Sequence, residues 1–266
     1  MKIFISADIE GVNGIVNWRE TEPDYPEYDY FKRQMTEEVK RACIGAKKAG
    51  AAEILVKDAH DTARNIIPSE LPEYVKIHRG WQGAPCSMMA GLDSSYDAVM
   101  FIGYHSASRS SGNSLSHTMN VSRLFHVKIN GKIASEFYIN ALYAAYLNVP
   151  VAFLSGDDQL TKNVKEENEN IVTVSTKEGV YGASISRHPN ITNKEIEDNV
   201  YTALTKDLKN NKLILPRHFD IEIQYKNHID AYNASFYPGC KLLGSDKVLF
   251  SSDDYYEVLR MFKFCL

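Results

Sequence analysis

Short apolar runs alternate with a helical pattern along the first 105 residues of the chain. Each run ends abruptly at polar residues, and the four runs span residues 2–7, 54–57, 75–78 and 97–103. Between the first two, apolar side chains recur at helical spacing over residues 27–49, and Gly50 follows where a helix would end. Continuous apolar runs joined by helices are typical of parallel strands buried on both faces. The pattern therefore predicts an α/β fold with a mainly parallel sheet flanked by helices.

A hairpin, a helix and another strand are predicted next. Asn130 and Gly131 form a tight-turn signal between residues 125–129 and residues 132–133. Ser135 is placed to cap a helix that runs to Leu147. Residues 151–155 then form an apolar run that stops at Gly-Asp-Asp. We expect these elements to complete an α/β core.

The chain becomes more polar beyond about residue 160. Thr192 and Glu195 form a capping-box pattern, which predicts the start of a helix running towards Leu208. Residues 219–225 alternate like a half-exposed strand, and residues 254–264 have the pattern of a C-terminal helix. We therefore expect a core over residues 1–160 and an appended, smaller α+β portion over residues 161–266, which would serve assembly or closure of a substrate site.

Composition narrows the classes of function. The 266 residues include 30 Lys and Arg against 34 Asp and Glu, and the net charge of -4 gives no general attraction to a nucleic-acid backbone. No apolar run approaches the roughly 18 residues that span a bilayer, and no secretory signal is visible. The four cysteines form no CxxC pair. We expect a cytoplasmic protein without nucleic-acid or membrane partners.

Residues with metal-binding and acid–base chemistry stand where the predicted strands end. Asp8 and Glu10 follow the first strand, Asp58 and His60 the second, and His105 the strand that ends at Gly103. Taken singly, such residues more often have a structural role, because acids are usually exposed and a neutral imidazole readily bonds to the backbone. The carboxyl ends of parallel strands, however, gather at one edge of a sheet, where ligands bind. These side chains should therefore meet in one crevice.

Two further groups complete a candidate metal centre. Glu136 lies in the first turn of the predicted helix, where the helix dipole also favours an acid. Nitrogen and oxygen donors of this kind suit divalent transition ions, zinc first. The expected ligands are Asp8, Glu10, His60, His105 and Glu136. Because five ligands exceed what one catalytic zinc takes, we expect two ions that share Asp8. His117, in a loop rich in serine and glycine, is the expected catalytic residue, which would move protons or orient a water.

The motifs around these residues resemble those of the D-aminopeptidases of the DppA type, peptidase family M55. They occur in the order of the family and comprise residues 6–11 (SADIEG), 58–60 (DAH), 103–105 (GYH), 115–118 (LSHT), 135–141 (SEFYINA), 149–151 (VPV) and 156–158 (GDD). Two departures are visible. Ala59 and Asp61 flank His60 where the family commonly reads Asp-Ser-His-Gly, and the C-terminal third matches less clearly. We expect these departures to affect substrate preference more than metal binding.

The resemblance implies a zinc-dependent enzyme with a binuclear site that cleaves short peptides beginning with a D-amino acid, such as D-Ala-D-Ala. It implies the same five ligands and His117 as the catalytic residue. It also implies a homo-oligomer, because members of the family form a decamer of stacked rings around a chamber.

Two other functions remain open from the sequence. Paired ions also suit a binuclear phosphoesterase, although the chain has neither a G-x-x-x-x-G-K-S/T loop nor a dense Arg and Lys cluster near its histidine motifs. A non-enzymatic α/β module that binds a metabolite is the other alternative. The segment from Gly11 to Gly14 does not match the G-x-G-x-x-G dinucleotide pattern, which weakens the dinucleotide form of that alternative.

Overall fold

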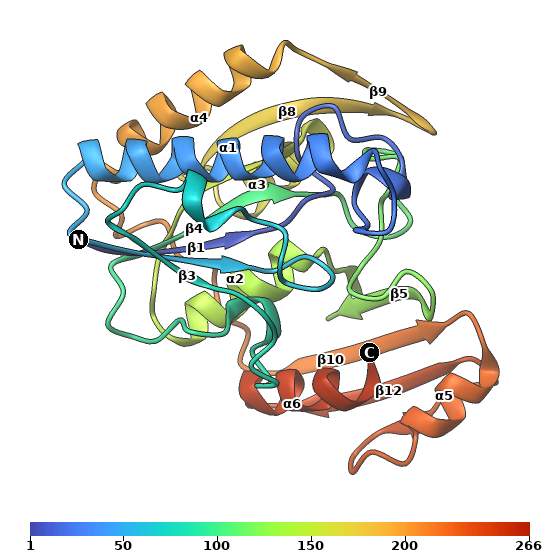
Figure 1. Ribbon diagram of the computed structural model, residues 1–266. Helices are drawn as coiled ribbons and strands as arrows, with labels where there is room; N and C mark the ends of the chain where they lie inside the picture. The colour runs from blue at the N-terminus through green and yellow to red at the C-terminus, as the bar shows by residue number, and fades with distance from the viewer.

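The computed structural model describes all 266 residues, which form two sheets and six α-helices (Figure 1). The larger sheet has seven strands in the order β3-β2-β1-β4-β7-β8-β9. These strands are β1 (Lys2–Ala7), β2 (Glu53–Asp58), β3 (Val75–His78), β4 (Ala98–Tyr104), β7 (Val151–Asp157), β8 (Val172–Val180) and β9 (Ala183–Ser186). Every neighbouring pair is parallel except β8 with β9. The predicted α/β fold with a mainly parallel sheet is confirmed.

Helices cover both faces of the larger sheet. On one face α1 (Tyr28–Lys48) and α4 (Pro189–Leu204) lie side by side (Figure 1). The opposite face is covered by α2 (Glu136–Tyr146) and α3 (Asp158–Glu167). Side chains of β1 alternate between the two layers, since Ile3 and Ile5 join the core under α1 whereas Phe4 joins the core under α2. Both faces of β1 are therefore buried, which explains its continuous apolar run.

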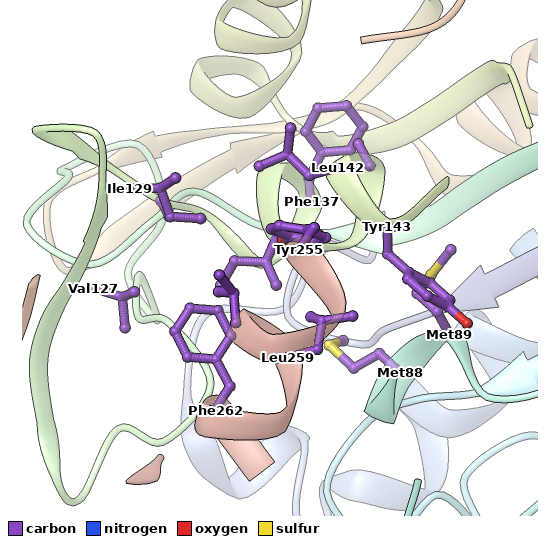
Figure 2. Close-up of a cluster of buried hydrophobic side chains, with 14 of the residues drawn as sticks. Met88, Met89, Val127, Ile129, Phe137, Leu142, Tyr143, Tyr255, Leu259 and Phe262 are labelled. Carbon is purple, nitrogen blue, oxygen red and sulfur yellow. The ribbon is translucent and has the colours of Figure 1, made fainter. Parts of the chain in front are cut away.

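The second sheet has five strands in the order β11-β12-β10-β5-β6, with every pair antiparallel. Its strands are β5 (Leu124–Ile129), β6 (Lys132–Ile133), β10 (Phe219–Tyr225), β11 (Lys241–Leu242) and β12 (Lys247–Ser252), accompanied by α5 (His228–Ala234) and α6 (Tyr255–Cys265). Figure 2 shows Leu259 and Phe262 of α6 within the buried cluster that also contains Phe137 and Leu142 of α2. One hydrophobic core therefore joins the second sheet to the helices of the first. None of the helices combines the length and apolar character needed to cross a bilayer.

Each sheet takes elements from both sides of residue 160. The hairpin β5–β6 pairs with β10 in the second sheet, whereas α4 packs against α1 on the first. The elements that follow residue 160 therefore contribute to both layers. The division of the chain into units of 1–160 and 161–266 stays a prediction.

The predicted capping box at Thr192 and Glu195 is wrong. Helix α4 begins earlier, at Pro189, and the side chain of His188 accepts a hydrogen bond from the backbone of Asn190. Thr192 is buried and donates to the carbonyl of Pro189, while Glu195 pairs with Arg187. Proline at the first helical position supplies the start signal, because it lacks the N–H that a helix leaves unpaired there.

Glu38 of α1 is a fully buried acid that reaches the loop after β1. Its Oε1 accepts hydrogen bonds from the backbone N–H of Asn13 at 2.9 Å and from Nε2 of Gln34 at 3.3 Å. Its Oε2 has no hydrogen-bond partner. Burial raises the pKa of Glu38 to about 7, against the lowering effect of the two hydrogen bonds.

Because of this raised pKa, we expect the free energy of unfolding of the wild-type protein to fall as the pH rises from about 5 to about 8. The Glu38→Gln variant, which has no carboxyl group at this position, should not show this fall. Between 4.5 and about 7 the unfolded chain has released a proton that the folded protein keeps, so rising pH favours unfolding. The full shift corresponds to a difference on the order of 3 kcal/mol, or several degrees in Tm. Thermal unfolding of both proteins at a series of pH values measures it. Tm curves that run parallel would contradict the prediction.

Candidate metal centre

The carboxyl edge of the larger sheet carries the predicted ligands. Asp8 and Glu10 lie in the turn directly after β1, and His60 lies in the loop after β2. His105 follows β4, and Glu136 is the first residue of α2, which Ser135 caps. The neighbouring strands β2, β1 and β4 bring these side chains together because all three run in the same direction.

Three groups of side chains have donor atoms close enough to hold a metal ion. Within each group the donor atoms lie within 4.8 Å of one another. The groups are Asp8, Glu10 and His60; Asp8, His105 and Glu136; and Glu10, His105 and His117. The structure therefore brings all six predicted site residues into one cluster. Their roles as ligands and as catalyst remain predictions.

The two oxygens of Asp8 face different histidines. Its Oδ1 lies 3.4 Å from Nδ1 of His60, which is also 3.2 Å from Oε2 of Glu10. Its Oδ2 lies 3.5 Å from Nε2 of His105, which is 3.6 Å from Oε1 of Glu136. Asp8 thus stands between the two groups that contain it and presents one oxygen to each.

Each histidine is anchored to the backbone through one ring nitrogen and directs the other into the cluster. Nε2 of His60 donates to the carbonyl of Thr21 at 3.0 Å, and Nδ1 of His105 donates to that of Ser106 at 2.9 Å. Nδ1 of His117 donates to the carbonyl of Leu115 at 2.9 Å. Such bonds fix the tautomer of the neutral ring and aim the second nitrogen, the one that a metal would bind, into the cluster.

Several buried atoms at the centre of the cluster have no hydrogen-bond partner. They are Oδ2 of Asp8, Oε2 of Glu10 and Nε2 of His105. Burial, and then the charge of Glu10, raise the pKa of Asp8 well above its ordinary value. Burial opposes protonation of His105, but Glu136 raises the pKa of this imidazole to about 10. Without a cation the cluster holds its carboxylates only by taking up protons, so its donor set fits divalent metal ions.

His117 lies at the edge of the cluster, between a histidine and a tryptophan. Its ring stacks on that of His105 with centroids 4.3 Å apart and meets Trp18 edge to face at 5.2 Å. Its Nε2 is 3.4 Å from Oε1 of Glu136. Burial, and then the charge of His105, lower the pKa of His117. An imidazole held neutral in this way can accept a proton near pH 7.

Two glycines allow β1 and β4 to end close together. The N–H of Gly11 donates to the carbonyl of Gly103 at 2.8 Å. A Cβ on Gly11 would lie 1.8 Å from the carbonyl oxygen of Tyr104, and a Cβ on Gly103 would lie 2.4 Å from that of Asp8. Gly103 also has a φ of +70°, which favours glycine. The glycines of the predicted motifs thus let the loops that carry Asp8 and His105 approach each other.

Asp58, which precedes His60 by two residues, has a different role from its neighbour. Its Oδ2 accepts hydrogen bonds from the backbone N–H groups of Asn65 and Ile66, and its Oδ1 accepts one from the side chain of Asn65. The same side chain donates to the carbonyl of His60 at 2.8 Å. Asp58 therefore shapes the loop that presents His60.

The cluster opens into a cavity of about 520 Å³. Both tryptophans of the chain, Trp18 and Trp81, line it, as do Leu259, Phe262 and Lys263 of α6. Sequence reasoning did not single out these residues. No local pattern marks Trp18 and Trp81 as cavity residues, and nothing in the pattern of the C-terminal helix indicates that it forms a cavity wall.

The chain is similar over nearly its whole length to known D-aminopeptidases. The family model of the M55 peptidases, described as D-aminopeptidase, matches residues 1–264. A D-aminopeptidase of Bacillus subtilis (strain 168) is 28% identical over 262 residues, covering 98% of this chain and 94% of that protein. A solved structure, the Zn-dependent D-aminopeptidase DppA from Bacillus subtilis, described as a self-compartmentalizing protease, is similar with a TM-score of 0.92 at 27% identity. That match covers 98% of this chain and 95% of the solved one.

The family model covers nearly the full length, including the C-terminal third in which the motifs are less distinct. The fold agrees as well, since the solved relative superposes on both sheets of this chain. The sequence motifs, the cluster at the sheet edge and the family match lead to one assignment: the chain belongs to peptidase family M55, the D-aminopeptidases.

Proposed function

We propose that this enzyme is a zinc-dependent aminopeptidase that hydrolyses short peptides with an N-terminal D-amino acid, of the D-Ala-D-Ala type, at a binuclear centre. The observation that carries the proposal is the pair of donor groups that share Asp8. The similar Bacillus subtilis protein is described as Zn-dependent, which supports zinc as the ion. Membership of a peptidase family argues against the phosphoesterase and the non-enzymatic module.

One ion would be held by Asp8, Glu10 and His60, and the second by Asp8, His105 and Glu136. The opposed orientation of the two Asp8 oxygens supports this division. Ions at these positions would supply an acidified water and a Lewis acid for the scissile carbonyl. The third group contains His117 and takes Glu10 from the first group and His105 from the second. An ion bound there would therefore use donor atoms that the other two ions need.

His117 would handle protons. Its Nδ1–H is committed to the carbonyl of Leu115, so Nε2 is the atom that can accept a proton in the cavity. Trp18 meets the ring at an interplanar angle of 70° and His105 stacks on its face, and these two contacts hold Nε2 in place. Glu136, which accepts a hydrogen bond from the N–H of Met119 at 2.7 Å, faces the same nitrogen.

Charges around the cavity suit a short peptide with two charged ends. Glu22 and Asp61 line it in addition to the carboxylates of the metal cluster. Lys263 of α6 is the one lysine or arginine among the lining residues. We propose that Lys263 attracts the terminal carboxylate of the peptide, while the acidic side of the cavity attracts the ammonium group.

The substrate proposal is tested by a panel of D-Ala-D-Ala, L-Ala-L-Ala and the two mixed dipeptides. We expect rapid hydrolysis of the dipeptides that begin with D-Ala, loss of this activity when a chelator removes the metal, and recovery when zinc is added. Full activity in protein shown to be metal-free would contradict the mechanism. Equal rates for all four dipeptides would contradict the stereochemical preference.

We also propose that the chain forms a cytoplasmic homo-oligomer, a decamer by analogy with the family. The description of the similar Bacillus subtilis protein as self-compartmentalizing supports assembly. Four cysteines without disulfides are compatible with a reduced compartment. The mass of the native protein in solution gives the number of subunits.

A further inference from the structure

Two side chains of β8 donate hydrogen bonds to the backbone of the loop that carries Asp8 and Glu10. Nζ of Lys177 donates to the carbonyl of Glu10 at 2.6 Å and to that of Ile15 at 2.5 Å. The adjacent Thr176 donates from Oγ1 to the carbonyl of Gly11 at 2.5 Å. Three carbonyls of one loop are therefore fixed by two consecutive residues of a strand more than 160 positions away.

The environment of Lys177 is unusual for a lysine. The residue is 2% exposed, and the hydrogen bonds of its Nζ go to two backbone carbonyls and to no carboxylate. Burial lowers the pKa of Lys177 to about 8. Burying a lysine without a carboxylate partner costs free energy. The hydrogen bonds that it donates offset this cost when the carbonyls that accept them would otherwise be buried without a partner. Backbone carbonyls of the loop are the partners that Lys177 has.

We propose that Lys177 is a positioning residue, which holds the loop after β1 in the conformation that presents Asp8 and Glu10 to zinc. The proposal rests on the proposed zinc centre and adds a residue outside the ligand set. One of the two hydrogen bonds of Lys177 falls on the backbone carbonyl of Glu10, whose side chain is a proposed ligand. Asn113 supports the same carbonyl, donating from Nδ2 at 3.0 Å.

Removal of Lys177 has two opposite effects on zinc affinity, one from the loss of its charge and one from the loss of its hydrogen bonds. A positive charge near the centre repels a metal cation, so its loss alone would strengthen zinc binding. Loss of the two hydrogen bonds frees the loop and weakens zinc binding, since the ligands are no longer held in place. A fall in zinc affinity therefore reports the positioning role.

The test compares Lys177→Met with Lys165→Met as a matched control. Lys165 also donates from Nζ to two carbonyls, those of Glu169 and Ile171, but these belong to the turn between α3 and β8. Zinc stoichiometry and affinity are measured by competition with a chromogenic chelator, alongside Tm, kcat and KM. We expect Lys177→Met to bind zinc about 10- to 100-fold more weakly and to regain activity in excess zinc. We expect Lys165→Met to lower Tm without changing zinc affinity.

Unchanged or tighter zinc binding by a folded Lys177→Met variant overturns the proposal. If that variant does not fold, Lys177→Gln gives the same test, because its side chain is one atom shorter and uncharged but stays polar, so it cannot keep both hydrogen bonds of Lys177. Weaker zinc binding by Lys177→Gln supports the proposal, and wild-type or tighter zinc binding overturns it. A wild-type protein that binds no zinc would instead contradict the proposed function.

Discussion

Replacing Asp8 by asparagine is expected to remove zinc from both positions and to abolish peptidase activity. The two oxygens of Asp8 face the separate groups of His60 and His105, so this one carboxylate belongs to both candidate sites. An amide keeps the shape but loses the charge and one of the two metal-binding oxygens. The loss of zinc affinity should exceed the roughly 10- to 100-fold typical of residues that only hydrogen-bond a ligand. Metal analysis of the purified variant, together with D-Ala-D-Ala turnover, measures both effects.

Glu10→Gln and Glu136→Gln are the matched controls, because each of these carboxylates belongs to only one of the two groups that contain Asp8. Each should lower the zinc content from two ions to one. An unchanged Tm of the metal-free proteins would exclude a general loss of folding. Retention of two ions by Asp8→Asn, or a single ion in the wild-type protein, would show that Asp8 does not bridge two sites.

Replacing His117 by alanine is expected to leave the zinc content unchanged and to lower kcat by about 10²- to 10⁴-fold. The two metal groups that share Asp8 do not include His117, whose Nε2 faces Glu136 at the edge of the cavity. The variant should therefore lose proton transfer while keeping its ions. Zinc analysis and steady-state kinetics with D-Ala-D-Ala separate these two effects.

His126→Ala is the control for His117→Ala. His126 is also a buried histidine, and its Nε2 lies 3.0 Å from Oε1 of Glu222, but it belongs to β5 in the second sheet and does not line the cavity. It should keep kcat close to the wild-type value. Loss of zinc from His117→Ala would reverse the assignment and make His117 a ligand, as the group of Glu10, His105 and His117 permits.

Local signals were sufficient to predict most of the elements around the site. Helix α1 follows from the periodicity of residues 27–49 and the glycine at position 50, and it spans Tyr28–Lys48. The hairpin β5–β6 follows from Asn130 and Gly131, both of which have positive φ. Strands β8 and β9 were missed because the alternation of apolar and polar residues there is confined to two stretches of four, residues 172–175 and 183–186, on either side of a polar, glycine-bearing segment. In the sheet β8 pairs in parallel with β7, and β9 pairs with β8 at the edge.

The sequence by itself determined that the site is at the carboxyl edge of a parallel sheet. The apolar runs of residues 2–7, 54–57 and 97–103 are each followed within two residues by Asp or His, and parallel strands end at the same edge, so a local pattern had a predictable consequence in space. The identity of the six clustered residues followed from the same rule and from the family motifs.

Only the tertiary structure decided what surrounds and supports that cluster. Lys177 is one polar residue in an irregular stretch, and its burial results from a loop 167 positions earlier in the chain. Likewise, α6 forms a cavity wall because its apolar side chains belong to the buried cluster that also contains side chains of α2, and Figure 2 shows Leu259 and Phe262 within that cluster. Local patterns predict which face of an element is buried, but which distant element covers that face depends on packing between segments that no local pattern connects.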